Sequence, residues 1–332
     1  MKYKIHIRAD GNQQIGLGHL VRCLAMAQML KDDYAIVFFC LDIPEELREE
    51  LKENGFKCIR ITKEESFISQ INSDTIVILD GYHFNTNYQR KVKNKAFKLV
   101  CIDDLHDKKF FADLIINHSP GINPTDYSAE HYTKYALGTE FAILRPSFID
   151  AAKTNRKITK IDTAFVCFGG SDQFNLTFKT TLALLKISQI KKINVVVGGA
   201  YDNPNIFELE KTNPKIQLYK NLSEKELILV MQESNLAIVP SSNILFEIMA
   251  AKTPFIIGYY INNQKPFYNY LIQNSFAQGL GYFLTKTVQE IYKLIEDLLI
   301  EKTALLSNRT NALIDGKSPE RILMKIKNLY HD

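Results

Sequence analysis

The chain has 332 residues, about twice the length of a usual domain, so two domains are expected. Hydrophobic residues make up 46% and charged residues 23%, which excludes disordered, collagen-like and coiled-coil proteins. Because 41 Lys and Arg nearly balance 37 Asp and Glu, the net charge is only +4. That balance argues against a nucleic-acid or membrane-surface protein and leaves a small anionic ligand open.

Cysteine usage and the first residues indicate the compartment. The five cysteines lie far apart with no C-x-x-C pair, and most occur in apolar runs, as small core residues do. Residues 1–10 lack the apolar segment of a signal peptide, and no later stretch approaches 18 apolar residues. We therefore expect a cytoplasmic protein, monomeric or weakly dimeric, with no membrane or nucleic-acid partner.

Short runs rich in β-branched and aromatic residues alternate with longer stretches of helical period, which is typical of βα units around a parallel sheet. The strands are predicted at residues 3–8, 35–40, 57–61, 75–79, 99–102 and 114–116, and then at 163–168, 193–197, 216–219, 236–239 and 255–257.

A polar, basic stretch at 147–161 interrupts the strand pattern and predicts a domain boundary. We therefore expect domains at 1–150 and 151–332, with the last helix packing back on the first. The fold class is α/β, with two Rossmann-like, doubly wound parallel-sheet domains facing across a cleft. In such sheets, ligands bind beyond the carboxyl ends of the strands.

Three helix starts in the second half are marked by their sequences. The pattern S-x-x-E at 223–226 and T-x-x-E at 287–290 predicts capping boxes, and Ser318 followed by a proline predicts an N-cap.

The first predicted strand leads into the run A-D-G-N-Q-Q-I-G-L-G-H, which opens an amphipathic helix. Gly16 and Gly18 let the backbone approach a ligand closely, and a helix N-terminus suits an anion. A dinucleotide fingerprint would need a third glycine at position 21, where this chain has Val21. The sequence therefore predicts no NAD and no other cofactor.

His19 lies in the first turn of that helix, where the positive end of the helix dipole favours the neutral imidazole that a general base requires. The alternative is a histidine that only donates a hydrogen bond to a loop carbonyl. Arg22 either contacts an anion or lies on a solvated face, and the solvated face is favoured. Asp10 either orients His19 or caps a turn.

Further polar groups follow later strands of the first domain. The segment D-G-Y at 80–82 brings Tyr82 to a strand end, as a cleft residue or as an edge tyrosine. Asp103 and Asp104 suggest metal or acid/base chemistry, or capping. Because neither D-x-D nor H-E-x-x-H occurs, we predict no metal.

The second half has two comparable turns. Gly170 and Ser171 follow a buried strand, and S-S-N-I-L-F-E at 241–247 begins another helix. Asn243 and Glu247 share a face of that helix, so its N-terminus can hold a diphosphate while Glu247 accepts from ribose hydroxyls. The alternative is capping by Ser242 or Asn243 with a solvated glutamate.

A third loop of the second half carries the amides Asn263 and Gln264, which can bind sugar hydroxyls or acetamido groups. Asparagine is also common in turns for its own backbone bonds, and this is the alternative.

Together, I-G-x-G-H, D-G-Y, the run G-T-E-F-A-I-L-R-P-S-F at 138–148, G-G-S-D, S-S-N-x-x-x-E and N-N-Q resemble the UDP-sugar hydrolases of pseudaminic acid biosynthesis, the PseG family. The resemblance spans residues 5 to about 264. More widely, the chain is similar to metal-independent glycosyltransferases of the GT-B fold, including the MurG type. Many of those relatives have a glycine-rich turn before the ribose-binding glutamate, where this chain has serines 241 and 242.

The resemblance assigns roles by position. It implies a base at His19, further catalytic residues at Tyr82 and Asn263, and nucleotide contacts at Gly170, Ser171, Ser242, Asn243 and Glu247. Together with the residue patterns, it puts Gly16, Gly18, Arg22, Asp10 and Gln264 in the substrate site.

The implied reaction is metal-independent hydrolysis of UDP-2,4-diacetamido-2,4,6-trideoxy-β-L-altropyranose to the free sugar and UDP, with inversion. The substrate and the product UDP are then the expected partners. Two alternatives stay open: a GT-B glycosyltransferase that uses a UDP-sugar donor, and a sugar-nucleotide-binding protein without catalysis.

Overall fold

The computed structural model describes residues 3–12, 14–301 and 312–330 and divides the chain into two compact units. Unit 1 comprises Met1–Pro146 and Lys317–Asp332, and unit 2 comprises Ser147–Gly316. This division lies four residues before the boundary expected from composition. Its cause is helix α5 (Pro146–Ala152), where the backbone N–H of Ser147 donates to the carboxylate of Glu224 at 2.6 Å.

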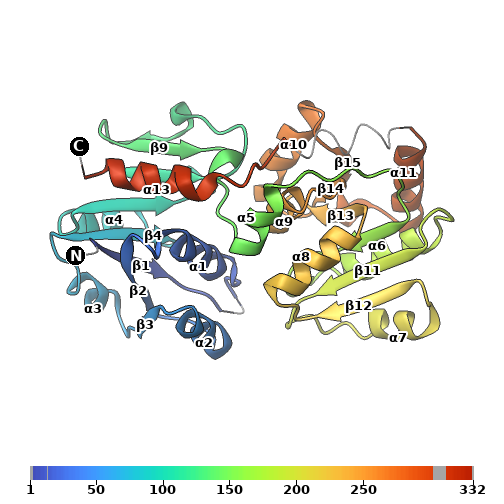
Figure 1. The fold of residues 1–332 in the computed structure, drawn as a ribbon, viewed down its shortest axis with the longest axis horizontal. Coiled ribbons are helices and arrows are strands. Elements are labelled where there is room, and N and C mark those ends of the chain that lie inside the picture. The colour runs from blue at the N-terminus through green and yellow to red at the C-terminus, as the bar shows by residue number, and fades with distance from the viewer. Residues whose placement is uncertain (1–2, 13, 302–311, 331–332) are drawn as a thin grey trace. The chain divides into compact units, whose positions relative to one another are not determined.

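The sheet of unit 1 has seven parallel strands in the order β3-β2-β1-β4-β5-β7-β9 (Figure 1). The strands are β1 (Tyr3–Ala9), β2 (Tyr34–Cys40), β3 (Lys57–Arg60), β4 (Thr75–Asp80), β5 (Lys98–Ile102), β7 (Leu114–Asn117) and β9 (Lys134–Leu137). A separate parallel pair joins β6 (Lys109–Phe110) and β8 (Ser128–Ala129). Strand order reverses between β1 and β4, which makes their carboxyl ends the place where a doubly wound sheet binds ligands.

Helices cover both faces of this sheet. One apolar core packs it against α1 (Gly18–Leu30), α2 (Glu45–Glu53) and the last helix α13 (Ser318–Asn328). The other core lies under α3 (Glu64–Ile68) and α4 (Thr86–Lys93). Figure 1 shows α13, in red, alongside the first sheet, and its buried Ile322 and Ile326 join the core with α1.

The sheet of unit 2 repeats the doubly wound order with β12-β11-β10-β13-β14-β15, all parallel. Its strands are β10 (Thr163–Val166), β11 (Lys192–Val197), β12 (Ile216–Lys220), β13 (Leu236–Pro240), β14 (Phe255–Tyr259) and β15 (Gln278–Tyr282). The helices are α6 (Leu176–Leu185), α7 (Asn205–Thr212), α8 (Glu224–Glu233), α9 (Asn243–Ala250), α10 (Lys265–Gln273) and α11 (Val288–Glu301). Here the strand order reverses between β10 and β13.

Short 3-10 helices complete the description. They are η1 (Pro124–Asp126), η2 (Thr139–Phe141), η3 (Asn262–Gln264) and η4 (Phe283–Thr285).

Every strand predicted from the sequence is present, within a few residues of its expected bounds. The sequence analysis missed β6, β8, β9 and β15. Strands β6 and β8 have two residues each, and β9 has four, which is too short for a clear alternation. Strand β15 contains Gly279 and Gly281, and glycine is disfavoured in strand interiors.

The predicted helix starts are mostly confirmed. Ser223 and Glu226 form a reciprocal capping box, and Thr287 makes the same pair of bonds with Glu290. The expected N-cap at Ser318 is wrong by one residue, because Lys317 is the N-cap and Ser318 is the first helical residue. None of the helices described is both long enough and apolar enough to cross a bilayer.

Candidate active site

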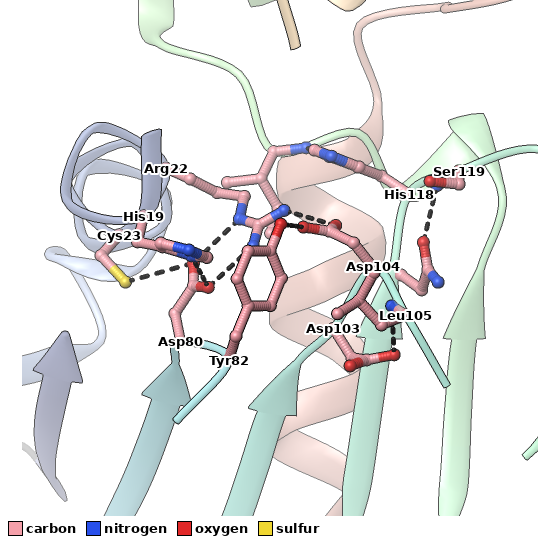
Figure 2. A network of polar contacts seen from close by, with 12 residues as sticks. His19, Arg22, Cys23, Asp80, Tyr82, Asp103, Asp104, Leu105, His118 and Ser119 are labelled. Atoms are coloured by element: carbon pink, nitrogen blue, oxygen red, sulfur yellow. Dashed lines mark hydrogen bonds and ion pairs between the residues drawn. The ribbon is translucent and has the colours of Figure 1, made fainter. Parts of the chain in front are cut away.

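His19 and Asp80 meet at the place where the strand order of the first sheet reverses. His19 lies in the first turn of α1, just after β1, and Asp80 is the last residue of β4. Nδ1 of the imidazole lies 2.7 Å from Oδ1 of Asp80 (Figure 2). The His19 side chain keeps 10% of its exposure, whereas the Asp80 side chain is fully buried.

The charge of Asp80 determines what its partner does. Burial alone raises the pKa of this carboxyl, but the charge and hydrogen bonds of Arg22 and the hydrogen bond from His19 outweigh it and lower the pKa to about 2. An ionised carboxylate only accepts hydrogen bonds, so Nδ1 of His19 must carry the proton in this contact. In the neutral ring, Nε2 is then unprotonated and has the lone pair that a general base needs.

Arg22 is buried one turn after His19 and bridges two carboxylates. Its Nε and Nη2 donate to the two oxygens of Asp80 at 2.8 and 2.7 Å, and its Nη1 donates to Asp104 at 2.7 Å. The favoured expectation of a solvated face is therefore wrong, since Arg22 is only 5% exposed. Its donors point at protein carboxylates, and its assignment as a substrate contact stays a prediction.

Tyr82 stands beside the imidazole. Its ring meets that of His19 edge-on, with centroids 4.7 Å apart and planes at 83°. Its hydroxyl donates to Asp104 at 3.3 Å, and its side chain stays 48% exposed. Burial and the nearby charge of Asp104 raise the pKa of Tyr82, so at neutral pH the phenol keeps its proton and donates it to Asp104.

Asp10 does not orient His19, because Asp80 takes that place. Asp10 pairs with the fully buried Arg8 at 2.7 Å and accepts from the N–H groups of Leu41 and Asp42, so it ties the loop after β1 to the loop after β2. This is the capping alternative, and the assignment of Asp10 to the substrate site stays a prediction.

Among the residues of the first unit that the structure describes, one grouping has the donor set for a cation. Asp10, Glu64 and His83 place one ligand atom each within 4.8 Å of one another. The Arg8 guanidinium already bridges the two carboxylates of that group, donating to Glu64 at 2.6 Å. Because this arginine supplies the counter-charge, we assign no metal to these residues.

The loop before α1 is shaped for close approach. Gly16 has a φ of +79°, which favours glycine, and no atom lies within 4 Å of the position that a Cβ would take. Leu17, the N-cap, makes no side-chain cap, and Gly18 opens the helix in an exposed position. The glycine turn expected before this helix is present, and its contact with an anion stays a prediction.

In unit 2, the loops after the neighbouring strands β10 and β11 pack against each other. Gly170 and Ser171 are exposed, while Asp172 behind them accepts from the N–H groups of Leu176 and Thr177 and so caps α6. A Cβ on Gly198, after β11, would lie 2.5 Å from Cα of Gly170. Gly198 therefore lets the two loops pack closely, a role that the sequence analysis missed.

The second turn of this unit is held by a serine that was not predicted. Ser241 is buried, and its hydroxyl contacts the carbonyls of Gly258 and Gln264 at 3.1 and 3.0 Å. Ser242 is the N-cap of α9 but makes no side-chain cap, so capping does not explain its hydroxyl. Asn243 follows in an exposed position.

Glu247 lies one turn later and is half-buried. Burial raises the pKa of the Cys167 thiol to about 12, and the negative charges of Glu247 and Asp172 contribute. Strands β10 and β13 are neighbours in the sheet, so the turns that follow them lie side by side where the strand order reverses.

The two amide residues in the loop after β14 have different surroundings. Asn263 is exposed in η3, whereas Gln264 is buried, and its side-chain oxygen accepts from the N–H of Tyr260 at 3.0 Å. Gln264 therefore makes the backbone bond expected of a turn residue, and its contact with the sugar stays a prediction.

Two carboxylates after β5 have different partners. Asp103 accepts from the N–H groups of Leu105 and His106 and from the hydroxyl of Tyr127, which is a structural role. Asp104 pairs with Arg22 (Figure 2). The sequence analysis gave Asp80 and Asp104 no role at His19, and the only available signal was their position at the ends of apolar strands.

No family model matches the chain. A UDP-2,4-diacetamido-2,4,6-trideoxy-beta-L-altropyranose hydrolase from Campylobacter jejuni is 26% identical over 84% of this chain and the whole of that protein. The chain is related to the PseG hydrolases. This confirms the resemblance expected from the motifs.

Two other relatives widen the comparison. An uncharacterized protein of Methanocaldococcus jannaschii is 27% identical over 80% of this chain, which spans only 57% of that relative. The spore coat polysaccharide biosynthesis protein SpsG of Bacillus subtilis is 23% identical over 98% of both chains.

Solved structures show the fold. MurG of Acinetobacter baumannii superposes with a TM-score of 0.68 over 99% of this chain and 100% of that chain, at 12% identity. The chain named TcCGT1, in complex with UDP, gives 0.70 over 100% of both chains, at 10% identity. The chain therefore has the GT-B fold with two Rossmann-like domains, as predicted.

Proposed function

We propose that this protein is an enzyme of pseudaminic acid biosynthesis that hydrolyses a UDP-linked diacetamido-trideoxy sugar to the free sugar and UDP. The observation that carries the proposal is the 2.7 Å contact between His19 and the buried Asp80. It leaves Nε2 of the imidazole as a base at the carboxyl edge of the first sheet. The related hydrolase of Campylobacter jejuni supports UDP-2,4-diacetamido-2,4,6-trideoxy-β-L-altropyranose as the substrate.

In the proposed reaction, water attacks the anomeric carbon from the face opposite UDP. Nε2 of His19 takes the proton of the water as its oxygen bonds to carbon. The bond between the anomeric carbon and the phosphate oxygen breaks, and its electron pair leaves with UDP. A single displacement inverts the anomeric configuration.

The leaving group explains why one base is enough. UDP departs as a stable anion, so the protonated carboxylic acid of an ordinary glycosidase is not required. Helix N-termini stabilise such an anion without a metal. We assign the diphosphate to the turns at Gly170, Ser171, Ser242 and Asn243, and the ribose to Glu247.

Tyr82 and Asn263 complete the proposed catalytic set. The ring of Tyr82 contacts the imidazole of His19 edge-on, and its hydroxyl donates to Asp104. Asn263 is exposed in η3, and its amide is suited to an acetamido group of the sugar.

The test is incubation of the UDP-sugar with the purified protein, without an acceptor and with EDTA present, while UDP release and the anomer of the product are followed. We expect rapid release of UDP and an inverted free sugar. A glycosyltransferase is the second candidate, because MurG and other proteins of the GT-B fold are structural neighbours of this chain. Release that requires an added acceptor, or that EDTA abolishes, would contradict the proposal.

A further inference from the structure

A closed ring of contacts joins His19 to Tyr82 through buried charges (Figure 2). It runs from His19 to Asp80 at 2.7 Å, through Arg22 to Asp104 at 2.7 Å, and from Asp104 to the Tyr82 hydroxyl at 3.3 Å. The edge-on contact between the two aromatic rings closes it. One guanidinium therefore fixes both carboxylates that hold the candidate catalytic side chains.

The charges of this ring do not cancel. Burial raises the pKa of Asp104, but the neighbouring Arg22 outweighs it and keeps the pKa below its ordinary value. Asp80 is also ionised, so two negative charges face one positive charge. With a neutral imidazole the ring carries one net negative charge, and with a protonated imidazole it is neutral.

The other described groups around the ring keep that balance near neutral pH. Lys108, whose Nζ donates to the carbonyl of Tyr82 at 3.0 Å, is paired with Asp107 at 3.6 Å. Burial holds the pKa of His118 at about 4 and lowers that of His83, so both are neutral. Burial raises the pKa of the Cys23 thiol, whose sulfur lies 3.7 Å from Asp80. Asp10 is paired with Arg8. Asp103, on the far side of Asp104, binds Tyr127 and two backbone N–H groups.

We propose that Asp104 is a positioning residue of the hydrolase: through Arg22 and Tyr82 it holds the ring of contacts around His19, and its charge leaves that ring with one negative charge in excess. This inference rests on the proposed function. When His19 takes a proton from water, the excess charge is neutralised, which stabilises the imidazolium that the reaction forms. Without Asp104, the negative charge of Asp80 would be fully balanced by the positive charge of Arg22.

The experiment follows the protonation of His19 directly. NMR of the full chain with labelled histidine, assigned against His19→Asn, gives the pH midpoint of the His19 titration without any substrate. We expect Asp104→Asn to lower this midpoint by about one pH unit, as expected for removing one nearby charge at an effective dielectric of about 20. Asp104→Glu, which keeps the charge, should restore it. Asp103→Asn is the matched control and should leave the midpoint in place.

Kinetics give the second readout. We expect Asp104→Asn to lower kcat about tenfold with little change in KM, and to move the acid limb of the pH profile by the same amount as the NMR midpoint. If Asp104→Asn does not fold, Asp104→Ser removes the charge with a smaller side chain. An unchanged midpoint in a folded variant overturns the inference, whatever the substrate. A shifted midpoint in a protein that releases no UDP supports the ring and contradicts only the proposed function.

Discussion

Nδ1 of His19 and Oδ1 of Asp80 lie 2.7 Å apart although 61 residues separate them in the chain. Strands β1 and β4 are neighbours in the sheet. Strand β4 ends at Asp80, and the loop after β1 leads into α1, which carries His19. The contact therefore depends on the doubly wound topology and sets the tautomer of the imidazole at the same time.

The substitution Asp80→Asn tests that dependence. The amide can present an N–H to Nδ1 and so favour the tautomer that is protonated on Nε2, which cannot act as a base. We expect kcat to fall about 10²–10⁴-fold, the usual range for a general base, while UDP still binds. The measurement is steady-state UDP release together with calorimetric UDP binding. An unchanged kcat would show that Asp80 does not set the tautomer.

Gly198→Ala tests whether the turn at Gly170 belongs to the nucleotide site. Its Cβ would lie 2.5 Å from backbone atoms of Gly170, so the loop after β10 must move. We expect about tenfold weaker UDP binding, equivalent to about 1.4 kcal/mol. Gly199→Ala is the matched control, since its Cβ meets only the side chain of Asn221, at 3.0 Å. Equal UDP affinity in the two variants would exclude the loop from the site.

Glu247→Gln tests the assignment of the ribose. A carboxylate accepts from both ribose hydroxyls, and hydrogen bonds to charged groups contribute about 1.5–3 kcal/mol. We therefore expect at least about tenfold weaker binding of UDP, and little change for UDP that lacks the 2′ and 3′ hydroxyls. The two ligands are compared by isothermal calorimetry on both proteins. An equal loss for both ligands would place Glu247 away from the ribose.

Stability at low pH follows from His118. Burial, followed by the charge of Arg22, lowers the pKa of this imidazole from 6.5 to about 4. The unfolded chain therefore binds more protons between these values, so stability is full above about pH 6.5 and is lost as the pH falls towards 4. The loss is about 3 kcal/mol from this group.

Urea unfolding at several pH values measures that loss. We expect His118→Asn to show a shallower fall between pH 6.5 and 4 than the unsubstituted protein, because its amide oxygen can still accept from the N–H of Ile143 as Nδ1 of His118 does. The same slope in both proteins would assign the pH dependence to other groups.

The strand pattern was predictable because it is local. Parallel strands buried on both faces give apolar runs, and β1, β4 and β10 were placed from such runs. The glycine loop before His19 was found in the same way. The edge strand β15 was not, because its two glycines remove the β-propensity that marks a strand.

The partners of His19 were not predictable, since they depend on which strands are neighbours. Asp10 is nearer to His19 in the sequence than Asp80 is, but its side chain leads to Arg8 and the loop after β2. Arg22 was expected in solvent. A buried arginine needs carboxylate partners, and the two partners of Arg22 lie far from it in the sequence, at the end of β4 and just after β5. Sequence spacing along one helix does not contain that information.

The substitution His19→Asn tests the central claim most directly. UDP-sugar turnover without an acceptor and UDP binding by calorimetry are measured for the variant and for the unsubstituted protein. We expect the variant to bind UDP as the unsubstituted protein does and to lose about 10²–10⁴-fold in turnover. Turnover at the original rate in a folded His19→Asn protein would contradict the account.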